Sequence, residues 1–466
     1  MCRGRFIKNS FENTRKPVLR CQTTCHTWRR AGTTAETLDR KTQTQQIDDQ
    51  FQKRISRYNI SFTKTMPIII ICIIVDMLGY MMIMPLLPFY AQSFGASEFT
   101  IGILTALNAV TSLLSGPIWG RLSDRYGRKR ILLISEVGTL ASFIILAAAN
   151  SIGMLMLARI VDGLFGGQIP VINAAISDVT APETRAEKMA VMSVAMTVGS
   201  IVGPMIGGYL GALHIVYPAY AACLMSIASI IATSLIFTET MPHERRDDLK
   251  KQADTRAAQK KGRVLTKTVM LRLAQIFTMM LVFSMIFSSL SLVLEQRYGA
   301  TSVSIGNIMA VMGICTFIFG GLLMKRVKDW IGEPRMLLFA IVLLIASYLI
   351  TPSLPTLASF YIFVIVFAAG NNFARPIVRS NLTRAVAEDQ QGLISGYSTT
   401  ASSIARIIAP LISTGWLQIG GLTLGGYALN EFVMIAATGA LVGVLFLLLF
   451  VVDLKSSDRE GGMGKL

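Results

Sequence analysis

Long apolar blocks are the feature that most restricts what this chain of 466 residues can fold into. Each block is about 20 residues long, enough for a helix rising 1.5 Å per residue to cross a hydrocarbon core of roughly 30 Å. Twelve such blocks account for most of the sequence, so it predicts an all-α membrane protein. They lie near residues 66–90, 99–119, 131–149, 152–176, 187–211, 216–238, 269–294, 303–324, 336–352, 357–382, 391–418 and 428–452.

The charged residues gather outside these blocks. The chain has 44 Lys and Arg against 27 Asp and Glu, a net charge of +17 that in a soluble protein would suggest a nucleic-acid partner. Residues 1–65 hold 14 basic and 5 acidic side chains, and residues 239–268 hold 9 and 5, so two hydrophilic segments carry +13 of the +17. The charge follows the membrane topology, and we expect no nucleic acid to bind.

The placement of Lys and Arg also predicts the orientation, because basic residues near span ends stay on the cytoplasmic side. With the N-terminus inside, 38 basic residues lie in cytoplasmic segments and one, Arg297, in the opposite loops. We expect a multi-pass protein of the plasma membrane, embedded in the lipid bilayer, with both termini in the cytoplasm. The predicted segments are a disordered basic tail (1–65), a first bundle (66–238), a linker (239–268), a second bundle (269–453) and a C-terminal tail (454–466).

The two halves of the chain share an internal repeat. A shift of 205 residues superposes four residues between the second and third blocks of each half. The matches are Gly116 with Gly321, Asp124 with Asp329, Gly127 with Gly332, and Arg130 with Arg335. Duplicated halves are typical of transporters. The sequence therefore predicts two pseudo-symmetric bundles of six helices each.

The segment from Gly120 to Arg130, interpreted as a loop, carries an acid among five basic residues. Gly120 and Gly116 are spaced to lie on one helix face and admit a neighbouring backbone, and Gly127 is suited to a turn that needs a positive φ. The carboxylate of Asp124 could bind the N-terminus of another helix or pair with Arg128. We expect this segment to act as a latch between the bundles that is closed in one conformation and broken in the other.

Two carboxylates lie near the middle of predicted spans. Asp76 and Asp162 each follow about ten residues of span, and an ionisable group at that depth costs at least ~2.5 kcal/mol. Arg159, one turn from Asp162, leaves two interpretations open, a permanent structural ion pair or a proton-coupling site. Asp76 has no basic residue on its own helix, and all three histidines lie outside the spans. We therefore expect Asp76 to be the principal proton site.

Two further blocks carry unusual residues. In the fifth, Gly199, Gly203 and Gly207 lie on one face beside Pro204 and Gly208, and we expect this face to pack against the partner bundle. The tenth is polar at its centre, with Asn371, Asn372 and Arg375. Glu136 and Arg406 lie near cytoplasmic span ends, where we favour a structural pair or contact with the interface.

Several of these motifs resemble those of one family. The pattern G-x-L-x-D-x-x-G-R-K from Gly120 resembles the cytoplasmic signature of the major facilitator superfamily. The fourth-span run 159–167 resembles its R-x-x-x-G-x-x-G element, and the run 199–208 resembles its antiporter-associated glycine-proline motif. The run 76–88 looks like the first-span motif of twelve-span drug–proton antiporters, including tetracycline exporters. The resemblance covers residues 66–453, although Lys325 replaces the repeat of Gly120.

The resemblance implies a major facilitator fold whose first, fourth, seventh and tenth helices line a central cavity. The implied function is secondary active efflux, in which a monomer exports a small amphipathic drug-like compound or metabolite in exchange for protons by alternating access. The polar residues that this fold would offer to a substrate are Asn108, Gln168, Asn173, Asn371, Asn372 and Arg375.

Two other functions remain open at this point. A symporter or facilitator could take up a sugar or an organic anion, with Arg375 as the anion ligand. A membrane enzyme or receptor would need a catalytic cluster or metal ligands, and the spans hold no histidine and no nucleophile–base motif. Cys21, Cys25 and His26 form at most half of a zinc site. We therefore expect neither enzymatic activity nor a metal or cofactor.

Overall fold

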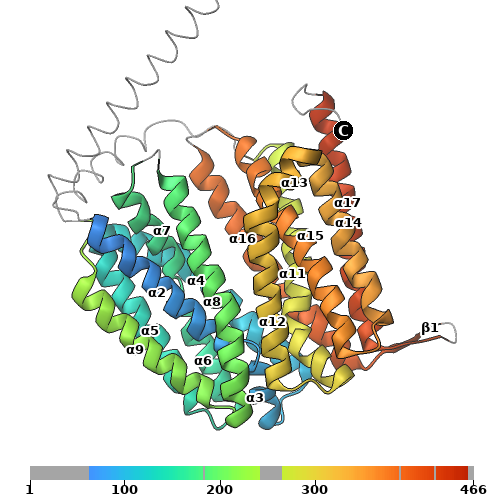
Figure 1. The fold of residues 1–466 in the computed structure, drawn as a ribbon, viewed down its shortest axis with the longest axis horizontal. Coiled ribbons are helices and arrows are strands. Elements are labelled where there is room, and N and C mark those ends of the chain that lie inside the picture. Colours follow the sequence, from blue (N-terminus) through green and yellow to red (C-terminus); the bar gives the residue numbers. More distant parts are fainter. Residues whose placement is uncertain (1–61, 182–183, 242–264, 388–389, 425–426, 460–466) are drawn as a thin grey trace, which may run out of the picture. The chain divides into compact units, whose positions relative to one another are not determined.

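Long helices make up nearly all of the computed structural model (Figure 1). The structure describes residues 62–181, 184–241, 265–387, 390–424 and 427–459. These residues belong to one compact unit, residues 60–466. The predicted N-terminal tail with its Cys and His residues, most of the linker, and the end of the C-terminal tail lie outside the described residues.

The first half of the chain forms helices close to the predicted blocks. Two blocks are interrupted, one at Pro85 and one at Gly166. The helices are α2 (Phe62–Ile83), α3 (Leu87–Ser93), α4 (Glu98–Tyr126), α5 (Arg128–Ala147), α6 (Ile152–Phe165), α7 (Gln168–Val179), α8 (Arg185–Leu213) and α9 (Tyr217–Ile236).

The second half repeats this pattern, with a π-helical segment, η1, inside its second long helix and a short hairpin before its last helix. The helices are α11 (Lys267–Tyr298), α12 (Ser302–Thr316), η1 (Phe317–Leu323), α13 (Met324–Ile331), α14 (Glu333–Ile350), the 3₁₀ turn η2 (Thr351–Ser353), α15 (Leu357–Arg384), α16 (Gln391–Ile419) and α17 (Glu431–Arg459). Between the last two helices, β1 (Leu422–Leu424) pairs antiparallel with β2 (Tyr427–Leu429).

Eleven helical segments in the described part of the chain are long and apolar enough to cross a membrane. The remaining predicted block forms α16, which has the expected length at 29 residues but is more polar. Its first half is rich in Ser and Thr, and Arg406 lies farther along. Helix α16 packs against both α11 and α4, so part of its polar surface contacts other helices.

Local sequence explains where many of these helices begin. Several helices start after a hydroxyl residue whose side-chain oxygen accepts a hydrogen bond from a backbone amide of the first turn, which is the usual N-cap. These N-cap residues are Ser97, Ser151, Thr266, Thr301 and Thr356. The break between α6 and α7 depends on glycine, because a Cβ at Gly167 would lie 2.6 Å from Trp119 Cδ1.

The helices of the two halves meet mainly through two pairs, α8 with α12 and α4 with α16. Close backbone contact makes the first pair possible, since a Cβ at Gly208 would lie 2.7 Å from the carbonyl oxygen of Ser302. In the second pair, a Cβ at Gly102 would lie 3.1 Å from the carbonyl oxygen of Pro410. All of these residues lie toward the end of the molecule away from the basic segments 121–130 and 325–335.

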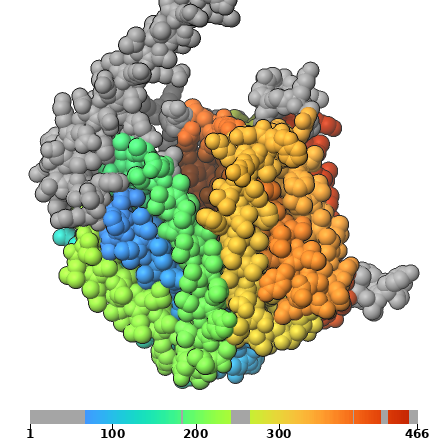
Figure 2. Space-filling view, viewed as in Figure 1, coloured from blue at the N-terminus to red at the C-terminus, as the bar shows by residue number. Residues whose placement is uncertain are grey.

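Further contacts between the halves lie at this same end. Ser291 Oγ donates to the carbonyl of Pro85 at 2.8 Å, and Gln296 Nε2 donates to Glu98 Oε1 at 3.1 Å. Toward the basic segments, neither η1 nor α13 has a buried residue. Figure 2 shows the surface hollowed there, between green α8 and yellow α13. The halves are therefore in contact at one end and separated at the other.

Candidate functional site

Asp162 is the centre of a buried polar cluster that joins α4 to α6. Its Oδ2 accepts a hydrogen bond from Asn108 Nδ2 at 2.8 Å and lies 3.4 Å from Arg159 Nη1. The helices approach closely here because Gly163, the next residue, packs against the backbone of Asn108 and the side chain of Thr111. The ion pair expected from the one-turn spacing is present in this conformation.

Arg159 is not fully satisfied by this pair. Its side chain is 2% exposed, yet its Nε and Nη2 have no hydrogen-bond partner within the described structure. A buried guanidinium with free donors is costly unless another group binds to it. The cluster therefore has guanidinium donors left for one more acceptor.

Asp76 is half-buried on α2 and differs from Asp162 in its partners. Among the described residues, its carboxylate makes no ion pair or hydrogen bond that we find. The charged groups that act on it are two other acids, Glu136 and Asp162. A carboxylate with two acids near it and no basic partner among the described residues is a candidate for a group that gains and loses a proton.

Glu136 lies on α5 and is 1% exposed. Its Oε1 accepts hydrogen bonds from Ser229 Oγ at 3.2 Å and Thr233 Oγ1 at 2.9 Å, both on α9. The sequence suggested a pair with Arg406 or contact with the interface, and the structure shows neither. The expectation failed because Ser229 and Thr233, far away in sequence, bring hydroxyl groups to this carboxylate.

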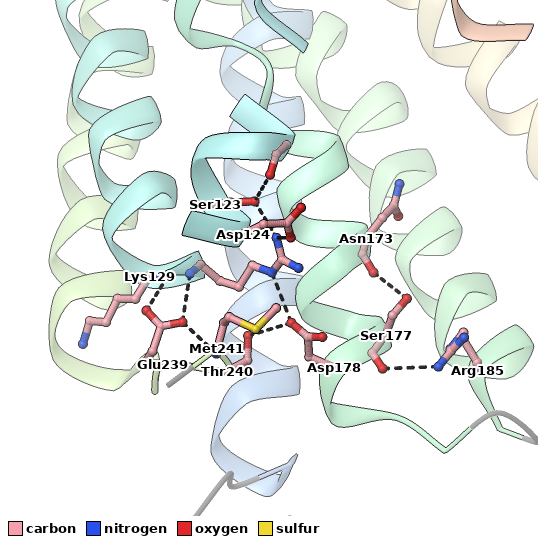
Figure 3. A network of polar contacts seen from close by, with 12 residues as sticks. Ser123, Asp124, Lys129, Asn173, Ser177, Asp178, Arg185, Glu239, Thr240 and Met241 are labelled. Carbon is pink, nitrogen blue, oxygen red and sulfur yellow. Dashed lines mark hydrogen bonds and ion pairs between the residues drawn. The ribbon is translucent and has the colours of Figure 1, made fainter. Parts of the chain in front are cut away.

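The remaining candidates of the first half lie in different surroundings. Asn108 is committed to Asp162, as described above. Gln168 is buried at the start of α7, where its Nε2 lies 3.4 Å from Thr139 Oγ1 and its Oε1 has no partner in the described structure. Asn173 is half-buried one and a half turns later, and its carbonyl accepts a hydrogen bond from Ser177 Oγ at 2.9 Å (Figure 3).

In the second half, α15 carries the polar candidates. Asn371 is buried, whereas Asn372 donates to Thr316 Oγ1 at 3.2 Å and so connects α15 to α12. Arg375 is exposed, and its charge interacts with those of Arg379 and Arg406. Within the described chain we find no acid paired with these three arginines, which makes this region the cationic counterpart of Asp76 and Glu136.

Arg128 is the centre of a second polar cluster, at the junction of α4 and α5, and Figure 3 labels its partners Asp124 and Asp178. Its Nη1 lies 2.7 Å from Asp124 Oδ1, and its Nε lies 3.1 Å from Asp178 Oδ2. The side chain of Asp178 is 8% exposed, but that of Asp124 is 64% exposed. The arginine therefore ties the α4–α5 junction to the end of α7, and Asp124 stays accessible.

The predicted loop from Gly120 to Arg130 is helical except for one residue. Helix α4 continues to Tyr126, Gly127 turns the chain with φ +101°, and α5 begins at Arg128. The positive φ at Gly127 is confirmed. No neighbour comes within 4 Å of a Cβ placed at Gly116 or Gly120, so the close approach expected there is not made in this conformation.

Glu239, which the sequence left inside the linker, caps α5 from a distance. Its carboxylate accepts hydrogen bonds from the backbone amides of Arg128 at 2.8 Å and Lys129 at 3.2 Å (Figure 3). A carboxylate at a helix N-terminus is favourable because the first amides lack partners. Sequence reasoning missed the roles of Glu239 and Asp178. The only hint in the sequence was that each is an acid near basic residues.

The glycine-proline segment of α8 packs differently from the expectation. Gly199, Gly203 and Gly207 face α2 of the same half, since a Cβ at the first would lie 2.5 Å from Met77 Cβ and one at the second 2.8 Å from Met81 Cβ. Gly208, on the adjoining face, packs against α12 of the other half. The segment therefore joins α2, which carries Asp76, to the contact between the halves.

Comparison with known proteins agrees with this fold. Residues 69–410 match the family Major Facilitator Superfamily. The chain is 28% identical over 353 residues to the tetracycline resistance protein, class H, of Pasteurella multocida, which covers 75% of this chain and 88% of that protein. It is 25% identical over 358 residues to multidrug resistance protein 2 of Bacillus subtilis, covering 76% and 89%.

Solved structures show the same architecture at lower identity. The human organic anion transporter MFSD10 (TETRAN) aligns with a TM-score of 0.62 and 19% identity, covering 83% of this chain and 99% of that one. A peptide transporter, POT, solved with sulfate, aligns with a TM-score of 0.68 and 12% identity, covering 84% and 96%. The family match spans more than half of the sequence, and the chain therefore belongs to the Major Facilitator Superfamily of membrane transporters.

Proposed function

We propose that this transporter exports a small amphipathic compound in exchange for protons. The observation that carries the proposal is Asp76, a half-buried carboxylate inside the membrane with no basic partner among the described residues. Protonation would remove the cost of its charge and favour one conformation, and substrate binding would favour the other. The resistance proteins among the relatives support efflux as the direction of transport.

The contacts between the halves support alternating access. The halves touch through Gly208 and Ser302 at one end and are separated at the end that carries the basic segments. Because the charge distribution predicts that the basic end is cytoplasmic, we assign the described conformation as open to the cytoplasm. In it Asp124 is exposed, and the one ion pair that we find for it among the described residues is with Arg128 of its own half, as expected of a latch in its broken state. We expect the transporter to act as a monomer in the plasma membrane.

A flux measurement in proteoliposomes tests this proposal. Vesicles that contain the purified protein are loaded with each member of a panel of drugs and metabolites, and the outside is made acidic. A gradient of one pH unit supplies about 1.4 kcal/mol per proton. Exchange predicts that loaded substrate leaves faster under the gradient and that protons enter with it. Substrate and protons moving in the same direction would contradict exchange.

A second function has a specific observation in its favour. The arginines Arg375, Arg379 and Arg406 lack a paired acid within the described structure, and one structural neighbour is named as an organic anion transporter. Uptake of an organic anion together with protons is therefore the alternative. The same vesicles distinguish it, because an acidic outside would then drive accumulation of an external anion.

A further inference from the structure

Four acidic side chains are almost fully buried within the described residues, and three of them lie beside an arginine. The three pairs are Asp162 with Arg159 at 3.4 Å, Asp178 with Arg128 at 3.1 Å, and Asp453 with Arg272 at 3.3 Å. Glu136 is the exception, because we find no basic partner for it in the described chain. The same protein thus neutralises its other buried acids with arginine and leaves this one without a cation.

The hydrogen bonds of Glu136 suit a neutral carboxyl group better than a charged one. Oε1 accepts from the hydroxyls of Ser229 and Thr233, but Oε2 is buried and has no partner in the described structure. A charged carboxylate with one unsolvated oxygen and no cation is strongly destabilised in a membrane interior. Protonation removes that charge, so the surroundings favour the acid form in this conformation.

A chain of contacts leads from Glu136 toward Asp76. Thr233 Oγ1, which donates to Glu136, also lies 3.0 Å from Cys72 Sγ on α2. Cys72 and Asp76 are four residues apart and so lie on the same face of α2, one turn from each other. Glu136 is also one of the two acids whose charge acts on Asp76. Ionisation of either group therefore disfavours ionisation of the other.

Other charged groups on the neighbouring helices are already engaged. On α4 and α7, Asp124 and Asp178 are paired with Arg128, and on α6 Asp162 is paired with Arg159. On α5 itself, Lys129 Nζ donates to the carbonyl of Ser234 at 2.8 Å, and Arg128 lies in the cluster already described. Of the other titratable groups on α2 and α9, which include Tyr80 and Cys223, Cys72 lies against the Thr233 hydroxyl that donates to Glu136, and Asp76 feels the charge of Glu136.

We propose that Glu136 is a second proton-binding carboxyl of the transport cycle, whose protonation is coupled to that of Asp76. The inference rests on the proposed proton exchange. In the described conformation Glu136 keeps its proton. When α2 shifts against α5 and α9, the O–H bond breaks, the proton passes to water, and the hydroxyls of Ser229 and Thr233 stabilise the resulting carboxylate. The group thus adds to the protons exchanged for each substrate molecule.

The test compares the purified wild type with Glu136→Gln, which keeps the shape and removes the titratable group. We expect Glu136→Gln to exchange about one fewer proton per substrate molecule, and to lose one infrared carboxyl band that titrates in the wild type. Exchange of substrate for substrate without a gradient should persist. Glu295→Gln, an acid on α11 outside this cluster, is the matched control and should keep the wild-type proton count.

A wild type that shows no pH-driven exchange overturns the proposed function and this inference together. A wild type that exchanges protons, with Glu136→Gln giving the same proton count and the same titrating bands, overturns the inference alone. If Glu136→Gln does not fold, Glu136→Asp and Thr233→Val replace it. Glu136→Asp should keep the wild-type proton count but shift the pH profile of exchange. Thr233→Val removes a hydroxyl that donates to Glu136 and should shift the same profile. An unshifted pH profile in both variants contradicts the proposal.

Discussion

The junction between the second and third long helices occurs once in each half, and the two junctions use opposite charges. A shift of 205 residues places Arg128 of the first half on Glu333 of the second, each directly after a glycine of positive φ. Arg128 binds two acids, whereas Glu333 binds two bases, Lys328 at 2.5 Å and Arg384 at 2.7 Å. Both junctions have a glycine turn followed by an ion-paired residue, but that residue is basic in the first half and acidic in the second.

Burial is the more important difference between the two junctions. The side chain of Arg128 is 6% exposed, that of Glu333 is 21% exposed, and its partners are 40% and 58% exposed. A buried charge that loses its partner costs several kcal/mol, whereas exposed pairs contribute at most about 1 kcal/mol. We therefore expect the ion pairs of the first junction to contribute more to stability than those of the second.

Arg128→Ala should have the largest effect on stability. It removes the arginine that lies 3.1 Å from the buried carboxylate of Asp178, and we expect a loss of about 3–5 kcal/mol in the free energy of unfolding. Thermal unfolding of the purified protein measures this. Arg128→Lys is the matched control and should recover part of the loss, because it restores the charge but not the forked geometry. A variant as stable as the wild type would show that the buried cluster is not what holds this junction.

Gly208→Leu should have the next largest effect, now on the equilibrium between conformations. The new side chain would collide with the backbone of α12 and push the halves apart at the end where they touch. We expect transport to fall at least about tenfold, since 1.4 kcal/mol suffices for such a change. Distances between labels on α8 and α12 would report the separation. Gly153→Leu is the control, because no atom lies within 4 Å of a Cβ there.

Arg375→Gln tests whether the unpaired arginines of the second half attract anions. A charge-assisted contact contributes about 1.5–3 kcal/mol, so the affinity for an anionic substrate should fall about tenfold or more. Binding of a neutral or cationic compound should change little. Equilibrium binding to the protein in detergent measures both. Equal losses for the two kinds of compound would mean that Arg375 shapes the site without recognising charge.

Glu333→Gln should have the smallest effect. Glu333 and its two partners are accessible to water and ions. We therefore expect the free energy of unfolding to fall by at most about 1 kcal/mol. High salt should remove even that difference. Unfolding of Glu333→Gln beside Arg128→Ala completes the comparison, and a loss as large as that of Arg128→Ala would contradict the role given to burial.

The fold could be predicted from sequence because the membrane imposes it. Apolar length predicts helices, and bases at span ends predict the topology, so the long helices emerged near their expected bounds. Gly127 was recognised because a turn between two long helices needs a positive φ. Boundaries were less predictable, because α4 continues to Tyr126 through charged residues that resemble a loop.

The candidate site was harder to predict because its partners are distant in sequence. The one-turn spacing made an Asp162–Arg159 pair one of the two interpretations left open, but nothing local placed Asn108 on the same carboxylate. Glu136 was misjudged for the same reason, since its hydroxyl partners lie more than 90 residues away. Glu239 was missed because a cap contributed by a remote segment leaves no periodic pattern.

The central claim is that Asp76 couples protons to transport, and Asp76→Asn tests it most directly. In proteoliposomes loaded with substrate, Asp76→Asn should lose the export that external acid drives. Its export rate should fall to that of loaded vesicles without the protein. It should retain exchange of substrate for substrate without a gradient, because that exchange needs no change of protonation. Acid-driven export at the wild-type rate in Asp76→Asn would contradict the account.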